Sequence, residues 1–139
     1  MRTIRKEIVI NAPPAKVWEH ITDPAKIAGW LMDNSFQATV GRKYTMEHCE
    51  HGDLMGQISG VVTEAIPNEK LVYTWTSQVI KVQTTVTITL TEEKGRTRLV
   101  LEHSGWEAPP ADQTIPDTFD KGWSEHLKAL QDQIAEAGK

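Results

Sequence analysis

A strict alternation of apolar and polar side chains restricts the fold of this chain more than any other feature. In the stretch VQTTVTITL, one side carries Val82, Val86, Ile88 and Leu90, and the other side carries Gln83, Thr85, Thr87 and Thr89. This period of two residues is typical of a strand with one buried face and one face in water. The next residues, EEKG, predict a tight turn, and RTRLVLEHS then predicts a strand that pairs back as a hairpin.

The same alternation recurs along most of the chain. Strands are predicted at residues 3–11, 35–41, 42–49, 52–67, 68–77, 82–90 and 96–104. Gly56 and Gly60 predict a bulge or bend in the fourth of these strands. Two short helical patterns follow the first strand, and the second of them begins at Asp23, which can cap it, and Pro24, which suits its first turn.

The period changes again near the end of the chain. From about Asp117 the apolar side chains recur every three or four residues, the spacing of one face of a helix. They are Phe119, Trp123, Leu127, Leu130 and Ile134. The apolar face of the antiparallel sheet is the only large surface on which this helix can bury its own apolar face. We therefore predict one α+β domain over residues 1–139, with a sheet curved around the C-terminal helix.

Composition and charge argue against several classes of function. With 39% hydrophobic and 24% charged residues, the chain of 139 residues has the composition of a globular domain. Its net charge of −4 argues against a nucleic-acid partner, which requires a clustered basic face. No stretch approaches the length of a membrane span, the N-terminus lacks the apolar run of a secretion signal, and one cysteine cannot form an internal disulfide. We expect a cytoplasmic protein that has no contact with membranes.

Five separated motifs resemble the activator of Hsp90 ATPase homologue 1-like family, which belongs to the START-like, or SRPBCC, superfamily. The motifs are ITDPAKIAGW, SGVVTEAIPNEKLVYTW, TVTITL, TRLVLEHSGW and KGWSEHLKALQDQI. The resemblance implies the helix-grip fold, in which a seven-stranded antiparallel sheet curls around the C-terminal helix and leaves a deep pocket. It also implies that two copies of the chain could pair, and that an Hsp90-like chaperone could be a partner.

The stretch TMEHCEHGD contains the only cysteine of the chain between two histidines. A zinc site needs three or four converging ligands, but neighbouring strand residues such as His48 and Cys49 point to opposite faces. His51 lies in EHGD, which is typical of a hairpin turn. Cys49 shares the side of the strand that is predicted to face solvent with Lys43, Thr45 and Glu47, and no helix N-terminus is predicted nearby to activate its thiol. We expect no metal or other cofactor, and interpret the stretch as the tip of a hairpin.

The aromatic residues are the stronger signal for a functional site. A pocket lined by aromatic side chains and methionine, with a few polar groups, suits a small apolar ligand. The predicted lining residues are Trp30, Phe36, Tyr44, Met46, His48, Val62, Tyr73, Trp75, His103, Trp123 and Leu127. In this set His48 and His103 are candidate polar anchors, with local hydrogen bonding near strand ends as the alternative. Residues 30–36, at the mouth implied by the resemblance, are a candidate gate.

Three hypotheses for function follow. The first is binding of a small hydrophobic or aromatic ligand in the cavity between the sheet and the C-terminal helix. The second is an interaction module for an Hsp90-type ATPase, which the family name suggests. The third is an enzyme of the cyclase or dehydratase kind, which needs an acid–base pair in the pocket. Strict alternation places Glu64 on the side of Val62 and Ile66, although a one-residue bulge would turn it to the surface.

Overall fold

The computed structural model describes residues 4–30, 33–47, 57–77, 83–104 and 114–137. These residues form seven strands and three helices. The strands are β1 (Ile4–Ile10), β2 (Asp33–Asn34), β3 (Lys43–Glu47), β4 (Gln57–Ile66), β5 (Lys70–Ser77), β6 (Gln83–Glu93) and β7 (Arg96–Ser104). The helices are α1 (Pro14–Thr22), α2 (Pro24–Trp30) and α3 (Thr114–Ala137).

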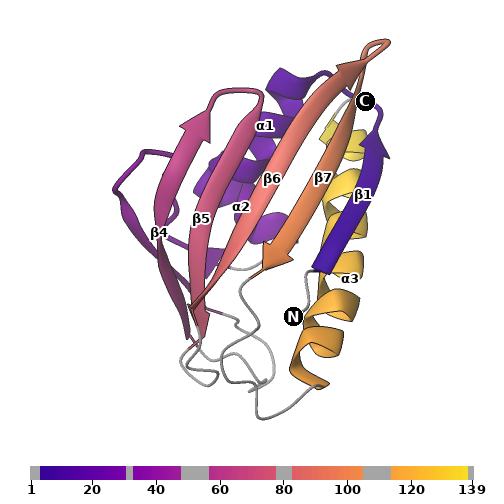
Figure 1. Ribbon diagram of the computed structural model, residues 1–139. Coiled ribbons are helices and arrows are strands. Elements are labelled where there is room, and N and C mark those ends of the chain that lie inside the picture. The colour runs from indigo at the N-terminus through magenta and orange to yellow at the C-terminus, as the bar shows by residue number, and fades with distance from the viewer. Residues whose placement is uncertain (1–3, 31–32, 48–56, 78–82, 105–113, 138–139) are drawn as a thin grey trace.

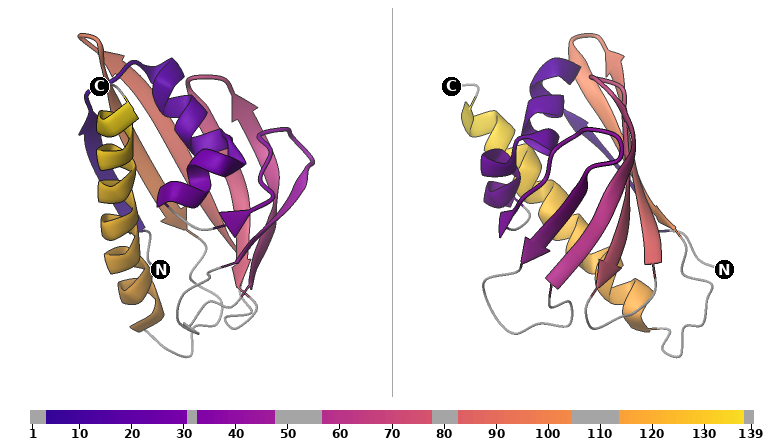
Figure 2. Two further views of the ribbon diagram at one scale, coloured as in Figure 1. Left: turned by 180° about the vertical axis from the view of Figure 1, so that it is seen from behind. Right: turned by 90° about the vertical axis from the view of Figure 1, so that its left-hand side faces the viewer.

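The strands form one antiparallel sheet with the spatial order β1-β7-β6-β5-β4-β3-β2. From β2 to β7 each strand pairs with the next strand along the chain, and β1 pairs with β7. All three helices cover the same face of the curved sheet, and α3 runs along the edge formed by β1 (Figures 1 and 2). The predicted α+β helix-grip fold, with two short helices after the first strand and a long helix at the end, is confirmed.

The strand predicted at residues 35–41 is wrong, because the backbone of this stretch bonds locally. The Thr39 amide donates to the carbonyl two residues earlier, and the Thr39 carbonyl accepts from the Arg42 amide. Gly41 has a φ of 87°, in the left-handed region that favours glycine. The short strand β2 lies just before this turn. Phe36 is still buried, so the predicted direction of its side chain is correct.

A β-bulge in β4 changes the face on which Glu64 lies. The register between β4 and β5 shifts between Val62 and Glu64, and one extra residue reverses the alternation beyond it. Ile66 is therefore 39% exposed although Val62 is buried. Glu64 lies on the outer face, with a carboxylate oxygen 3.6 Å from Nζ of Lys70. The expectation from strict alternation is thus wrong for Glu64 and Ile66, and the alternative of a bulge is confirmed.

Local signals in the sequence correctly located the turns and the start of α2. Lys94 and Gly95 join β6 to β7 with φ values of 55° and 81°, the two positive angles that a tight type I′ hairpin turn requires. At the start of α2 the Ala25 amide donates to Oδ1 of Asp23 at 3.0 Å, as expected for a capping aspartate. Helix α3 begins at Thr114, earlier than the predicted start near Asp117.

Helix α3 buries the predicted apolar face against the sheet. Of that face, Trp123, Leu127, Leu130 and Ile134 are buried, while the side chain of Phe119 lies outside the described residues. Each such side chain contributes about 1.5–3 kcal/mol relative to an exposed one, which holds α3 over the inner face. In the described ranges no helix is long and apolar enough to cross a membrane.

Hydrogen bonds occupy backbone groups at one position near each edge of the sheet. At β1, Nε2 of Gln131 from α3 donates to the Val9 carbonyl at 2.7 Å. At the other edge β2 pairs with β3 over two residues only. Ser35 then continues this pairing, because its amide donates to the Thr45 carbonyl and its hydroxyl accepts from the Thr45 amide, both at 3.0 Å.

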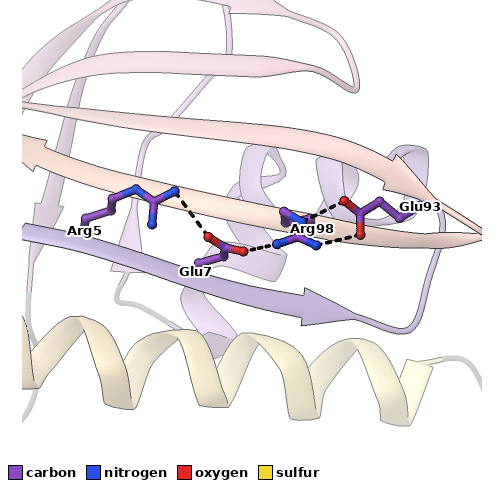
Figure 3. A network of polar contacts seen from close by, with 4 residues as sticks. All are labelled: Arg5, Glu7, Glu93 and Arg98. Atoms are coloured by element: carbon purple, nitrogen blue, oxygen red, sulfur yellow. Dashed lines mark hydrogen bonds and ion pairs between the residues drawn. The ribbon is translucent and has the colours of Figure 1, made fainter.

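The outer face of the sheet carries a network of ion pairs across three strands (Figure 3). Arg98 on β7 donates to both carboxylate oxygens of Glu93 on β6, at 2.8 and 2.9 Å, and also contacts Glu7 on β1. Glu7 lies 3.2 Å from the guanidinium of Arg5. These side chains are exposed enough for water to screen their charges, so the network contributes little to stability. It makes this part of the outer face polar.

Candidate functional site

The structure places most of the predicted site residues in the interior between the sheet and the helices. The buried ones, each at most 4% exposed, are Trp30, Phe36, Tyr44, Val62, Tyr73, Trp75, His103, Trp123 and Leu127. The side chain of Met46 and the whole of His48 lie outside the described residues, as do residues 31–32 of the candidate gate. On the inner face the buried aromatic residues form two clusters, which meet at β5.

The first cluster, called the tyrosine cluster here, consists of Phe36, Tyr44 and Tyr73. The ring centroid of Phe36 lies 5.2 Å from that of Tyr44 and 5.3 Å from that of Tyr73. The centroids of the two tyrosine rings are 5.6 Å apart. All three pairs meet edge to face, the geometry that aromatic quadrupoles favour. The three rings therefore hold one another in fixed orientations.

Gly60 allows the Tyr44 side chain to cross from β3 to β5. Gly60 on β4 is the partner of Tyr44 in the sheet, and the Tyr44 hydroxyl donates to the carbonyl of Thr74 on β5. That carbonyl would lie 2.1 Å from a Cβ atom on Gly60. The Val61 amide donates to the Thr74 hydroxyl at 2.9 Å. In a regular antiparallel ladder a backbone carbonyl would be the acceptor instead of this hydroxyl. The sequence predicted a bend near Gly60 but not this contact.

The second cluster, called the histidine cluster here, consists of Trp75, Thr84, His103 and Trp123. Nε1 of Trp123 donates to Nδ1 of His103 at 3.0 Å, so the ring proton of a neutral His103 is on Nε2. Nε2 lies 2.6 Å from Oγ1 of Thr84 and donates to it, and Thr84 in turn donates to the Trp75 carbonyl at 3.0 Å. Each donor in this chain of hydrogen bonds has an acceptor.

Burial keeps His103 uncharged. The side chain is fully buried, and burial lowers the pKa of His103 to about 3. Both ring nitrogens already bond to protein atoms, so a ligand could use His103 as a polar anchor only by displacing Thr84 or Trp123. Sequence reasoning missed Thr84, although it is a polar residue at a position where the alternation of β6 expects an apolar one.

A third polar group links the helices. Nε2 of Gln133 on α3 donates to Nδ1 of His20 on α1 at 2.8 Å and to the Lys26 carbonyl at 3.0 Å. Nε1 of Trp30 on α2 donates to the His20 carbonyl at 2.8 Å. Burial lowers the pKa of His20, and the positive charge of Lys26 adds to this effect. These bonds tie α1 and α2 to α3, and no local pattern in the sequence indicated them.

The structure does not test the metal and thiol alternatives for TMEHCEHGD. His48, Cys49 and His51 all lie outside the described residues. In the ranges that are described, no three His, Cys, Asp or Glu side chains come close enough to hold a metal ion.

Two hollows in the described part of the chain lie away from both clusters. One, of about 460 Å³, lies between the end of β1, the start of α1 and the C-terminal half of α3, with Lys16 and Ile134 in its wall. The other, of about 720 Å³, borders the turn between β6 and β7 at Lys94. Neither hollow shares a lining residue with the tyrosine or histidine cluster.

A family model matches nearly the whole chain. The model of the activator of Hsp90 ATPase homolog 1-like (AHSA1-like) protein matches residues 11–135. The chain belongs to this family. The resemblance predicted for this AHSA1-like chain is thus confirmed. No curated protein is a significant match to its sequence.

Solved structures agree with the fold of this AHSA1-like chain. Protein MLL2253 from Mesorhizobium loti is 29% identical with a TM-score of 0.85, over 97% of this chain and 98% of that one. DynU16, a putative protein in the dynemicin biosynthetic locus, is 25% identical with a TM-score of 0.81, over 99% of this chain and 48% of that one. The Aha1 dimer from Colwellia psychrerythraea, at 22% identity and a TM-score of 0.76 over 96% of both chains, supports the fold alone.

Proposed function

We propose that this AHSA1-like protein binds a small hydrophobic or aromatic ligand in the interior between the curved sheet and α3. The supporting observation is the gathering of aromatic side chains from separate elements on one inner surface. They are Trp30, Phe36, Tyr44, Tyr73, Trp75 and Trp123. Among the described residues no Lys, Arg, Asp or Glu is buried, and the buried polar groups are few. Sites for small apolar molecules have this combination of apolar walls and sparse polar groups.

The two alternative functions have less support in the described part of the chain. An interaction module for an Hsp90-type ATPase would present a continuous apolar patch. The exposed large apolar residues, Val9, Val40 and Ile66, instead lie on β1, in the turn before β3 and at the end of β4. A cyclase would need a buried acid beside a base. Glu64 lies on the outer face instead, and both His103 nitrogens already bond to protein atoms.

Thermal denaturation with a ligand panel tests the proposal. The panel contains fatty acids, sterols, flavonoid-like aromatics and polyketide-like phenols. A ligand at about 100 times its Kd adds roughly 2.7 kcal/mol to the free energy of unfolding, so we expect one class to raise Tm by several degrees. The variant Trp75→Phe should weaken this effect because it reduces the apolar contact area. The control Thr87→Ala, on the outer face of β6, should retain it.

Absence of binding across the ligand panel would contradict the proposal. If no class shifts Tm and calorimetric titration of the same panel shows no heat of binding, the proposal is wrong. Capture experiments with a purified Hsp90-type ATPase would then test the second hypothesis. Pairing of two copies, which the resemblance to the family implies, is a separate proposal, and sedimentation velocity on the full chain checks it.

A further inference from the structure

Tyr73 differs from the other hydroxyl groups of the two clusters. The Tyr44 hydroxyl donates to the Thr74 carbonyl, and the Thr84 hydroxyl donates to the Trp75 carbonyl. The Tyr73 side chain is only 3% exposed, and no residue that the structure describes provides a hydrogen-bond partner for its hydroxyl. Buried hydroxyl groups usually have such a partner. The Tyr73 hydroxyl is not among the fully buried polar atoms that lack one in the described residues, so its oxygen is not sealed from the space around it.

The neighbours of Tyr73 in the sheet explain this difference. Tyr73 pairs with Val62 on β4 and with Val86 on β6, so the residues directly beside it offer no polar side chain. Its ring is held by edge-to-face contacts with Phe36 at 5.3 Å and Tyr44 at 5.6 Å. The phenol is thus fixed by aromatic packing and not by a hydrogen bond, and it faces the inner side of the sheet together with Trp75, two residues further along β5.

We infer that Tyr73 determines specificity in the proposed site, donating a hydrogen bond to a carbonyl or ether oxygen of an otherwise apolar, uncharged ligand. This inference rests on the proposed function, because it assigns the polar contact of that same site. A preorganised donor of this kind discriminates well, because it remains unpaired when the ligand lacks an acceptor.

The environment of Tyr73 indicates that its hydroxyl acts as a donor and that the ligand is uncharged. Burial raises the pKa of Tyr73 above its usual range, so the phenol keeps its proton and donates. No positively charged side chain is buried among the described residues, so a ligand carboxylate would have no described partner there. Burying an unpaired charge costs far more than burying a neutral carbonyl. An uncharged ligand with an acceptor oxygen is therefore the chemistry that fits.

A pair of probes that differ in one group tests the role of Tyr73. Benzophenone and diphenylmethane have the same two rings, joined by a carbonyl in the first and by a methylene in the second. In calorimetric titrations the wild type should bind the ketone about tenfold more tightly, which corresponds to one hydrogen bond. Tyr73→Phe should remove this preference by weakening ketone binding alone. Tyr44→Phe, the matched loss of a phenol hydroxyl, should retain the preference, whatever it does to both affinities.

Each other outcome has a separate meaning. Equal affinities of the wild type for the two probes, or a preference that persists in Tyr73→Phe, would overturn the role of Tyr73 while leaving ligand binding intact. If neither probe binds, the role of Tyr73 is contradicted, and the ligand panel described above decides separately whether the proposed function is wrong.

Urea unfolding without any ligand gives a second test. Tyr44→Phe should lower the urea midpoint, because it removes the donor to the Thr74 carbonyl. Tyr73→Phe should leave the midpoint nearly unchanged, because the hydroxyl that it removes makes no hydrogen bond to a described residue. If both variants lose the same stability, the Tyr73 hydroxyl has a protein partner and the inference is wrong.

Discussion

Replacing Gly60 with alanine is expected to lower the free energy of unfolding by about 3 kcal/mol, which is a severe loss for a domain of this size. A Cβ atom on Gly60 would lie 2.1 Å from the carbonyl oxygen of Thr74 and 2.7 Å from its carbonyl carbon. Both are backbone atoms of the neighbouring strand, so they cannot move aside as a flexible side chain would. The same carbonyl accepts the hydrogen bond from Tyr44. Urea unfolding followed by circular dichroism measures the loss.

Gly41→Ala is the matched control for this prediction. Gly41 has a φ of 87°, and a Cβ atom there would meet nothing within 4 Å. Its replacement should therefore cost only the strain of a left-handed backbone, about 1–2 kcal/mol. If Gly60→Ala costs no more than Gly41→Ala, then β4 and β5 adapt to the added methyl group, and the close approach does not constrain position 60.

The free energy of unfolding is also expected to fall steeply as the pH is lowered from about 6.5 to 4.5. His20 and His103 are buried, and burial lowers the pKa of both side chains. Below the ordinary histidine pKa of about 6.5 the unfolded chain therefore binds protons that the folded chain does not. This contribution to stability is complete above pH 6.5 and is lost at up to about 1.4 kcal/mol per pH unit for each histidine. Urea unfolding at pH 7.5, 6.5, 5.5 and 4.5 measures the slope.

A variant at His20 separates the two contributions. In His20→Gln the side-chain oxygen can still accept from Gln133, but the group no longer titrates, so the slope should fall, and the slope that remains is the contribution of His103. The carboxylates of Glu19 and Glu93 contribute little to the change in the free energy of unfolding between pH 6.5 and 4.5. Hydrogen bonds from Lys26 and Arg98 lower their pKa values, so their contribution to stability is lost mainly below pH 4.5. A flat wild-type profile from pH 6.5 to 4.5 would contradict the neutral, hydrogen-bonded state of His103.

The regular helices and strands were predictable because their buried positions recur in the sequence with a constant period. Alternation located β6 and β7, and the spacing of Trp123 and Leu127 located α3. The errors occurred where the backbone departs from a constant period. Local hydrogen bonds around Gly41 replace an expected strand, and the bulge before Glu64 reverses the faces of the residues after it.

The candidate site was predictable only in part, for a related reason. Alternation indicates which face a side chain is on, and it placed Tyr73 and Trp75 together on the inner side. It does not indicate which atoms meet when residues are far apart in the chain. The bond from Gln133 to His20 and the hydrogen bond between Thr84 and His103 depend on how distant elements come together. Polar contacts of this kind require the folded structure.

The hydrogen bonds at Val9 and Thr45, near the two edges of the sheet, have a consequence for behaviour at high concentration. Unpaired backbone groups along an edge strand act as a template on which another chain can add a strand, and this is a common route to fibrils. Near one edge the Gln131 side chain donates to the Val9 carbonyl. Near the other edge the Ser35 amide donates to the Thr45 carbonyl, and the Ser35 hydroxyl accepts from the Thr45 amide. Strand addition at these positions would first have to displace side chains that already act as caps. Extension of the sheet by a second copy is therefore disfavoured at these two positions.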